Sequence, residues 1–128
     1  MDKKEIGNKG EDFAAEYYRK LGFEITGRNF HCRGGEIDII AENGEYIIFV
    51  EVKTRSDNSI YSPAEAVDEV KQKKLSLAAM KYLSENENGK QPQFDVFEVY
   101  SHKDRIYKFQ RIENAFECFD FGGKYDIF

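Results

Sequence analysis

Three carboxylates and an ammonium group stand among Ile, Val and Phe residues in one short stretch of the chain, at Glu36, Asp38, Glu51 and Lys53. Carboxylate oxygens are ligands that Mg²⁺ prefers, and a bound Mg²⁺ can generate hydroxide or stabilise the leaving oxygen when a phosphodiester is cleaved. An ammonium group at the same point could hold the attacking water or the scissile phosphate. The residue types therefore indicate metal-assisted phosphodiester hydrolysis, provided that the fold brings these side chains together.

The hairpin that would bring them together is predicted from the Asn43-Gly44 pair. An Asn-Gly pair between two apolar runs is typical of a two-residue turn, because both positions must accept positive φ. In that register Glu42 lies opposite Glu45, and Asp38 lies opposite Phe49. Directly opposed residues share a face of the hairpin, and neighbours in sequence alternate between faces.

This register gives the hairpin one apolar face and one mixed face. The apolar face carries Ile37, Ile39, Ala41, Ile48, Val50 and Val52, and the mixed face carries Glu36, Asp38, Ile40, Ile47, Phe49, Glu51 and Lys53. On the mixed face Asp38 and Glu51 are diagonal neighbours, roughly 7–8 Å apart between backbones, which is close enough for both to bind one cation. The alternative is a lattice of surface ion pairs, although charges in such lattices seldom have neighbours this apolar.

Asp38 followed by Glu51-Val52-Lys53 resembles the D…E-x-K signature of the PD-(D/E)XK nuclease superfamily, which includes type II restriction enzymes and archaeal Holliday-junction resolvases. Ile37 stands where the signature has proline, which is not a ligand. A longer part of the chain resembles the bacterial YraN family, also called UPF0102, which is assigned to the same superfamily by fold and motif. The matching segments are Gly10-Glu11-Asp12-Phe13-Ala14-Ala15, Arg28-Asn29-Phe30, Cys32-Arg33-Gly34-Gly35-Glu36-Ile37-Asp38, Phe49-Val50-Glu51-Val52-Lys53-Thr54-Arg55, Ala66-Val67, Lys71 and Phe94-Asp95-Val96.

The resemblance implies an α/β, single-domain restriction endonuclease-like fold, in which a central mixed β-sheet is flanked by helices. It implies a Mg²⁺-dependent endonuclease that hydrolyses DNA, with branched or damaged structures as candidate substrates and Mn²⁺ as a substitute ion. Asp38 and Glu51 would be metal ligands, and Lys53 would hold the water or the phosphate. The rival hypothesis is a non-catalytic module that binds nucleic acid or protein on the same fold, since a fold does not determine a function.

Apolar residues at helical spacing predict a first helix over residues 5–21, which Gly22 ends in the left-handed conformation. Glu11 lies in a strip of small residues on this helix, with Gly7, Gly10, Ala14 and Ala15. A carboxylate on such a packing face either reaches out to solvent or meets a cation. The resemblance to resolvase-like nucleases favours the second alternative, with Glu11 as a further metal ligand and catalytic residue.

The remaining pattern completes the order αβββαββ. We expect a strand over 23–30, a loop over 31–35, a second helix, and strands over 94–100 and 106–112. The second helix begins either at a capping box, Ser62-Pro63-Ala64-Glu65, or at Asp68 as a second N-cap.

Residues 1–112 form the nuclease-like domain in this interpretation, and residues 113–128 form an acidic, aromatic segment. We expect the segment to pack on the domain, although it could instead form a homodimer contact or bind a protein partner.

The net charge of −5 argues against a general nucleic-acid coat, because binding to the phosphate backbone depends mostly on Lys and Arg. Any contact with DNA is therefore expected to be a local patch. The candidates are Arg28, Arg33, Lys53, Arg55, Lys71, Lys73 and Lys74. Helical spacing puts Lys71 and Lys74 on one side of the second helix and Lys73 off that side.

The two cysteines, Cys32 and Cys118, match no zinc-binding spacing. Because the chain begins without an apolar targeting segment, they are predicted to be free thiols of a cytoplasmic protein. The longest uninterrupted apolar run, residues 46–50, is far too short to span a membrane, so no membrane association is expected.

Overall fold

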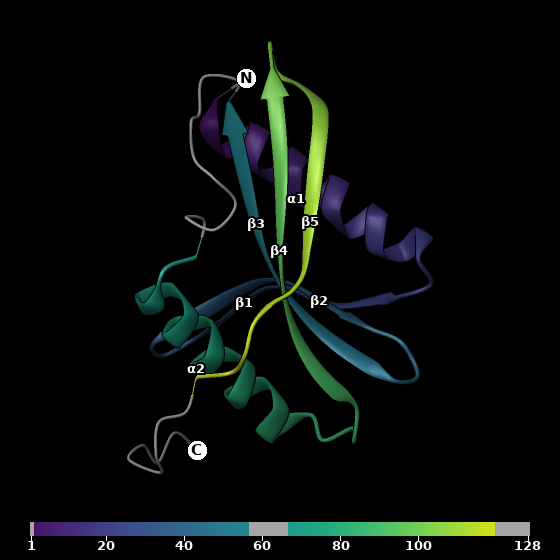
Figure 1. Cartoon of the computed structure of the whole chain (residues 1–128), viewed down its shortest axis with the longest axis vertical. Helices are drawn as coiled ribbons and strands as arrows, with labels where there is room; N and C mark the ends of the chain where they lie inside the picture. Colours follow the sequence, from purple (N-terminus) through teal and green to yellow (C-terminus); the bar gives the residue numbers. More distant parts are fainter. Residues whose placement is uncertain (1, 57–66, 120–128) are drawn as a thin grey trace.

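A computed structural model describes residues 2–56 and 67–119, which form one open five-stranded sheet with a helix on each face (Figure 1). In chain order the elements are α1 Lys3–Lys20, β1 Glu24–Cys32, β2 Gly35–Glu42, β3 Tyr46–Ser56, α2 Glu69–Glu85, β4 Gln91–His102 and β5 Arg105–Phe116. The strands lie in sequence order across the sheet, and only β3 and β4 are parallel. The predicted fold class and the order αβββαββ are confirmed.

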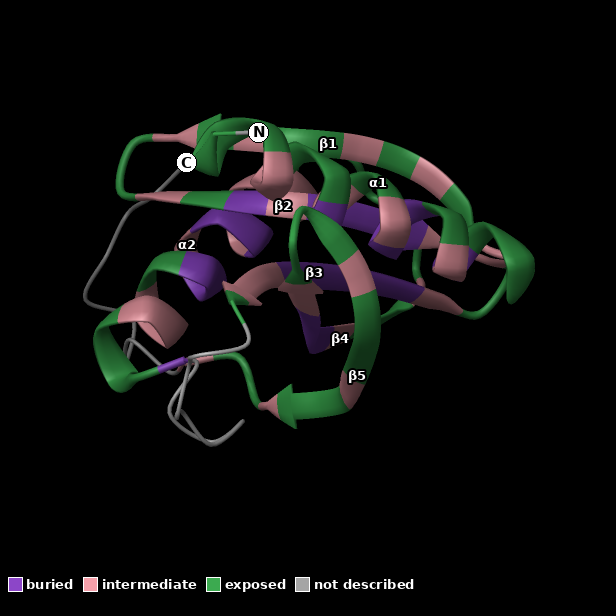
Figure 2. Ribbon diagram, turned by 90° about the horizontal axis from the view of Figure 1, so that it is seen from above, coloured by how far each residue is buried: buried purple, intermediate pink, exposed green. Residues whose placement is uncertain are grey.

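The two helices bury opposite faces of the sheet, each in its own core. Figure 2 shows the buried segments of β2 and β3 in purple. On one face Ala14, Ala15 and Tyr18 of α1 pack in one core with Ile39, Ala41, Ile48, Val50, Phe97 and Val99. On the other face Leu75, Ala78 and Ala79 of α2 pack with Ile37, Ile40, Ile47, Phe49, Phe94 and Val96. Helix α2 also lies in the crossover that connects the parallel strands β3 and β4.

Both helices begin at an aspartate N-cap. The carboxylate of Asp2 accepts from the Glu5 N–H at 2.8 Å, and that of Asp68 accepts from the Lys71 N–H at 2.8 Å. Of the two predicted starts of the second helix, Asp68 is the observed cap, and the capping box at Ser62 lies outside the described residues. Gly22 follows α1 with φ +95°, as predicted.

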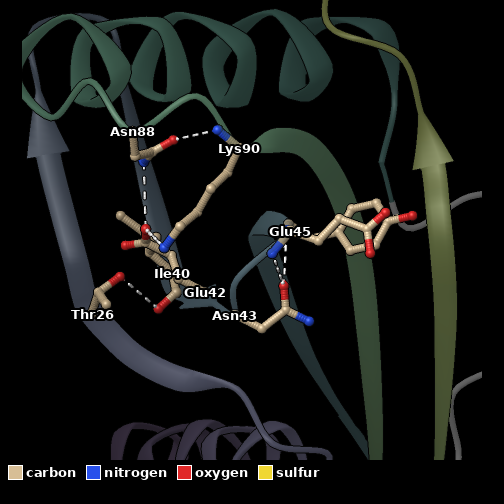
Figure 3. Close-up of polar contacts among 8 residues, drawn as sticks. Thr26, Ile40, Glu42, Asn43, Glu45, Asn88 and Lys90 are labelled. Atoms are coloured by element: carbon tan, nitrogen blue, oxygen red, sulfur yellow. Dashed lines mark hydrogen bonds and ion pairs between the residues drawn. The ribbon is translucent and has the colours of Figure 1, made fainter.

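The predicted two-residue turn at Asn43-Gly44 is wrong. The Asn43 side-chain oxygen accepts from the N–H groups of Glu45 and Tyr46 at 2.9 and 2.7 Å (Figure 3). Gly44 does not adopt positive φ. The Asn43 side chain thus holds the loop together with the backbone bond that the Asn43 N–H donates to the Tyr46 carbonyl oxygen at 3.0 Å, without positive φ at Asn43 or Gly44. The ladder between β2 and β3 begins with Glu42 opposite Ile47.

The β2–β3 register is consequently shifted by two residues from the predicted one, and Ile39 lies opposite Val50 instead of Ile48. A shift of one residue would have turned every side chain of β3 to the other face, whereas a shift of two leaves each on its predicted face. Ile37 is an exception, because it packs on the α2 face instead of the α1 face. The ladder with β3 ends at Ile39, and beyond it β2 pairs only with β1.

The turn between β1 and β2 is shorter than the predicted loop and is pressed against α2. Cys32 pairs with Gly35 across the two-residue turn Arg33-Gly34, so His31 belongs to β1. A Cβ atom on Gly35 would lie 2.1 Å from the carbonyl oxygen of Lys74. Only glycine allows this approach of β2 to the helix backbone.

We therefore expect Gly35→Ala to destabilise the protein by roughly 2–3 kcal/mol, because backbone atoms of α2 must move to admit the methyl group. Gly44→Ala is the matched control, since no atom of the described residues lies within 4 Å of its Cβ position. Urea unfolding of the two variants and the wild type measures both effects. Equal free energies of unfolding for the two variants would contradict the close approach.

Strand β5 continues beyond residue 112 to Phe116, so the beginning of the acidic, aromatic segment is part of the sheet. Phe116 stacks on Phe94 with ring centroids 4.7 Å apart, and the Phe119 N–H donates to Ser76 Oγ at 2.8 Å. Both cysteines are free, as predicted. No helix in the described ranges is long and apolar enough to cross a membrane.

A buried aspartate on β4 ties three elements together. Asp95 is 1% exposed and accepts from the Tyr18 hydroxyl of α1 at 2.7 Å and from Arg111 Nε of β5 at 2.8 Å. Its other oxygen accepts from Gln93 Nε2 at 2.9 Å and from the Asn114 N–H at 3.0 Å. Both oxygens are therefore satisfied, which is the condition for burying a charged group without a large penalty.

Candidate functional site

One cavity of about 690 Å³ collects the four residues predicted to be catalytic. Glu11 comes from α1, Asp38 from β2, and Glu51 and Lys53 from β3. Glu36 also lines this cavity. The structure therefore brings together side chains from three elements, of which Glu11 and Lys53 lie 42 positions apart in the sequence.

The local geometry of β2 and β3 explains how Asp38 enters the cavity. Just beyond the last pair of the ladder, Ile39 with Val50, the Asp38 carboxylate accepts from the Val52 N–H at 2.8 Å. The side chain thus takes the place of a backbone partner where the two strands part. This bond fixes the Asp38 carboxylate between the strands and beside Glu51.

Helix α1 reaches the same place because of a small residue. A Cβ atom on Gly10 would lie 2.2 Å from Thr54 Oγ1, so the helix backbone packs directly against the Thr54 side chain of β3. Glu11 follows Gly10 in sequence and lines the cavity. The strip of small residues therefore places Glu11 in the cavity near Asp38. Its role as a metal ligand stays a prediction.

The carboxylates of the cavity repel one another. Burial, and then the charges of Glu51 and Glu11, raise the pKa of Asp38 to about 7, against the opposing effect of the Val52 N–H. A carboxylic acid with such a pKa changes its charge near neutral pH. In the absence of a further cation, the cluster therefore holds more negative charge than it can stabilise.

Glu51 is 4% exposed, and its two oxygens have different surroundings. Its Oε1 lies 3.4 Å from Lys53 Nζ and 3.2 Å from Lys71 Nζ of α2. Its Oε2 is buried and has no hydrogen-bond partner among the described residues. Burial alone would lower the pKa of Lys71, but the charge of Glu51 outweighs it and the pKa is raised, so Lys71 stays charged.

These oxygens suit a hard cation. Besides Glu51 Oε2, the buried Oε1 of Glu11 has no hydrogen bond within the described part of the chain, although Arg28 Nη2 lies 3.6 Å away. Residues 2–56 and 67–119 contain no group of three His, Cys, Asp or Glu side chains already gathered at metal-binding distance. Mg²⁺ commonly uses only one or two carboxylates and completes its shell with water and substrate phosphate. Asp38 and Glu51 provide that number, with Glu11 close by.

The candidate DNA-binding residues fall into two groups. Arg28 is paired with Asp12 at 2.8 Å, and Arg55 is paired with Glu98 at 2.6 Å, so both guanidinium groups are already engaged by carboxylates. Lys71 is paired with Glu51. Arg33 and Lys74 are exposed, and the structure shows no ion pair of either with any described residue. Arg33 and Lys74 are therefore the two predicted cations that the described part of the chain leaves available to a ligand.

Two residues near the cavity were missed from the sequence. Glu98 on β4 is fully buried and holds Arg55, which lines the cavity. Lys3, in the first turn of α1, lines the cavity as well. The signal for Glu98 was a carboxylate inside the apolar run 94–100, whereas no sequence feature distinguished Lys3 from other terminal lysines.

Comparisons with known proteins give a consistent result. A family model described as "Uncharacterised protein family UPF0102" matches residues 10–99, which include every carboxylate of the cavity. The chain is 44% identical over 119 residues to a UPF0102 protein of Caldicellulosiruptor saccharolyticus, which covers 91% of this chain and 100% of the relative. It is 44% identical over 119 residues to a UPF0102 protein of Caldanaerobacter subterraneus, with 91% and 98% covered, and 46% identical over 86 residues to one of Carboxydothermus hydrogenoformans, with 67% and 73% covered.

Proposed function

The chain belongs to the UPF0102 family, and from this membership together with the cavity we propose that it is a Mg²⁺-dependent endonuclease that hydrolyses DNA phosphodiester bonds. Mn²⁺ is expected to substitute. The observation that supports the proposal best is the meeting of Asp38 and Glu51 in one cavity, with an oxygen of Glu51 buried and without a hydrogen bond to any described residue. The resemblance to the PD-(D/E)XK nucleases belongs to this proposal, as do branched or damaged DNA substrates.

The residues have distinct roles in the proposed reaction. Asp38 and Glu51 would hold the ion, and Glu11 would be an auxiliary ligand on the α1 side. When bound, Mg²⁺ supplies hydroxide at neutral pH and stabilises the leaving oxygen. Lys53, whose ammonium group lies 3.4 Å from Glu51 Oε1, would hold the attacking water or the scissile phosphate.

The negative charge of the cavity supports an order of binding in which a cation binds before the DNA substrate. A phosphate approaching Asp38, Glu51 and Glu11 would be repelled, and Lys53 and Lys71 are already paired with Glu51. A divalent ion would neutralise the carboxylates and release the ammonium groups to the DNA. Binding of DNA in the cavity should therefore depend on the metal.

The test is a cleavage assay on linear, single-stranded, flapped and four-way DNA with Mg²⁺ or Mn²⁺. We expect the wild type to cut at least one of these substrates, and Asp38→Ala to cut it about a thousandfold more slowly or not at all. Glu16→Gln is the matched control, because Glu16 is an exposed helix carboxylate that pairs only with Arg19 in the described part of the chain, at 3.6 Å. It should cut at the wild-type rate.

The second candidate function is a non-catalytic binding module, and it is supported by the ion pairs of the cations near the cavity. Of the cations near the cavity, Lys53, Lys71 and Arg55 are each held by a buried carboxylate. A wild type that binds the DNA panel and cuts none of it with either metal would contradict the endonuclease and favour the module.

A further inference from the structure

Two smaller cavities adjoin the main cavity, and all three share Lys71. The turn cavity, about 320 Å³, is lined by His31, Gly34, Gly35, Glu36, Lys71 and Lys74. The helix cavity, about 260 Å³, is lined by Lys53, Asp68, Val70, Lys71 and Lys74. The shared side chains make the three cavities one branched groove that passes across the first turns of α2.

The two smaller cavities are lined by three lysines, Lys53, Lys71 and Lys74, against the two carboxylates of Glu36 and Asp68. Lys74 faces both smaller cavities, and Lys71 faces all three. Against them stand Asp68, whose carboxylate caps α2 by accepting the Lys71 N–H, and Glu36, which lies 3.2 Å from His31. Lys74 is exposed and has no ion pair with a described residue, so its charge is available.

The walls of the turn cavity are held in place by packing. Gly35 lies against the carbonyl oxygen of Lys74, and a Cβ atom on Gly34 would lie 3.4 Å from Leu77. The β1–β2 turn therefore cannot move relative to α2 without breaking this contact. The backbone of Lys74 is thus held at a fixed corner, from which its side chain lines the turn cavity.

We propose that this groove binds the phosphate next to the scissile one on the cleaved DNA strand, with Lys71 between the two phosphates and Lys74 as the contact to the flanking phosphate. The proposal rests on the proposed function, and it names the path by which the strand leaves the main cavity. The neighbouring lysine is not part of this path. Lys73 lies 3.6 Å from Glu69 and 4.8 Å from the ring centroid of Phe119, on another side of the helix.

The chain therefore offers a matched pair of variants, Lys74→Gln and Lys73→Gln, which remove the same charge from adjacent positions of α2. Both are made in the Lys53→Gln protein and measured with Mg²⁺ present. This background keeps the proposed metal ligands Asp38 and Glu51 but lacks the residue proposed to hold the attacking water, so that DNA can bind and remain intact. Affinities for fluorescently labelled single-stranded and duplex DNA are measured by anisotropy over a range of salt concentrations, and circular dichroism melts confirm that the variants fold.

We expect Lys74→Gln to weaken binding roughly threefold to tenfold at low salt and to lower the salt dependence of log K by about 0.7 for single strands or about 0.9 for duplex, the effect of losing one phosphate contact. Lys73→Gln should change neither quantity. Equal effects of the two variants would overturn the flanking-phosphate site while leaving cleavage by the wild type, and thus the proposed function, intact. Absence of DNA binding to the parent protein and of cleavage by the wild type would overturn both.

Discussion

Asp38→Asn is expected to raise the melting temperature of the metal-free protein by roughly 5 °C and to abolish DNA cleavage. Asn keeps an oxygen for the Val52 N–H but removes a charge that Glu51 and Glu11 repel. One unit of pKa corresponds to about 1.4 kcal/mol, and since Asp38 is partly exposed we expect a net gain of about 1–2 kcal/mol. Mg²⁺ should raise the melting temperature of the wild type and leave that of the variant unchanged.

The gain in stability that Asp38→Asn gives should increase with pH. The pKa of Asp38 is raised from its ordinary value of 3.8 to about 7, so between these values the folded protein binds a proton that the unfolded chain has released. The stability of the wild type therefore falls as the pH rises from about 4 to about 7, and the variant lacks this fall. The difference in melting temperature should be near zero at about pH 4 and largest above about pH 7.

A surface lattice of ion pairs would give the opposite result. In such a lattice Asp38→Asn would remove a stabilising partner of Lys53, lower the melting temperature, and leave Mg²⁺ without effect on either protein. Thermal melts of the two proteins at several pH values, with and without Mg²⁺, decide between the outcomes. Glu16→Gln again serves as the control, because it removes a carboxylate of α1 that lies outside the cavity.

Asp95→Ala is expected to cost about 3–5 kcal/mol of stability, because it leaves the Arg111 charge and the Tyr18 hydroxyl without their buried acceptor. Burial and the neighbouring Asp95 carboxylate raise the pKa of Tyr18, so its hydroxyl keeps the proton that it donates. Urea unfolding measures the loss. Because α1 carries Glu11 and is tied to β4 by this bond, the variant should also lose part of the stabilisation by Mg²⁺.

Two variants with smaller expected losses of stability serve as references for Asp95→Ala. Tyr18→Phe removes one donor and should cost about 1 kcal/mol. Glu113→Gln removes a mostly exposed carboxylate 3.7 Å from Arg111 and should cost less than about 0.5 kcal/mol. Asp95→Ala as mild as Tyr18→Phe would show that Asp95 does not hold the three elements together.

The face of the hairpin on which the site residues lie could be predicted from the sequence, although the predicted turn was wrong. Side chains alternate with a period of two, so an error of two residues in the register left Asp38, Glu51 and Lys53 on their predicted side. The tight turn with positive φ at both positions is found instead at Lys103 and Asp104, with φ of 50° and 62°. There the pairing of His102 with Arg105 imposes it, without the Asn-Gly pair that usually indicates such a turn.

The position of Lys71 beside Glu51 could not be predicted from the residues that surround it in the sequence. Helical spacing separated it from Lys73, and the structure agrees, but its pairing with Glu51 depends on where the crossover sets α2 against β3. The same holds for Glu98 and Arg55, which lie on parallel strands joined by that crossover. Local patterns predicted the elements and their faces, whereas contacts across the crossover required the three-dimensional fold.

The loop between β2 and β3 offers a place to attach a reporter. It lies at the far end of both strands from the main cavity, since Asp38 is four residues before Glu42 and a strand rises about 3.3 Å per residue. The loop is held by the Asn43 side chain, while Lys90 Nζ lies 3.0 Å from Glu42 at its base (Figure 3). Gly44 at its tip has open space around it. A cysteine placed there could carry a fluorophore without touching the cavity, the groove on α2 or either core.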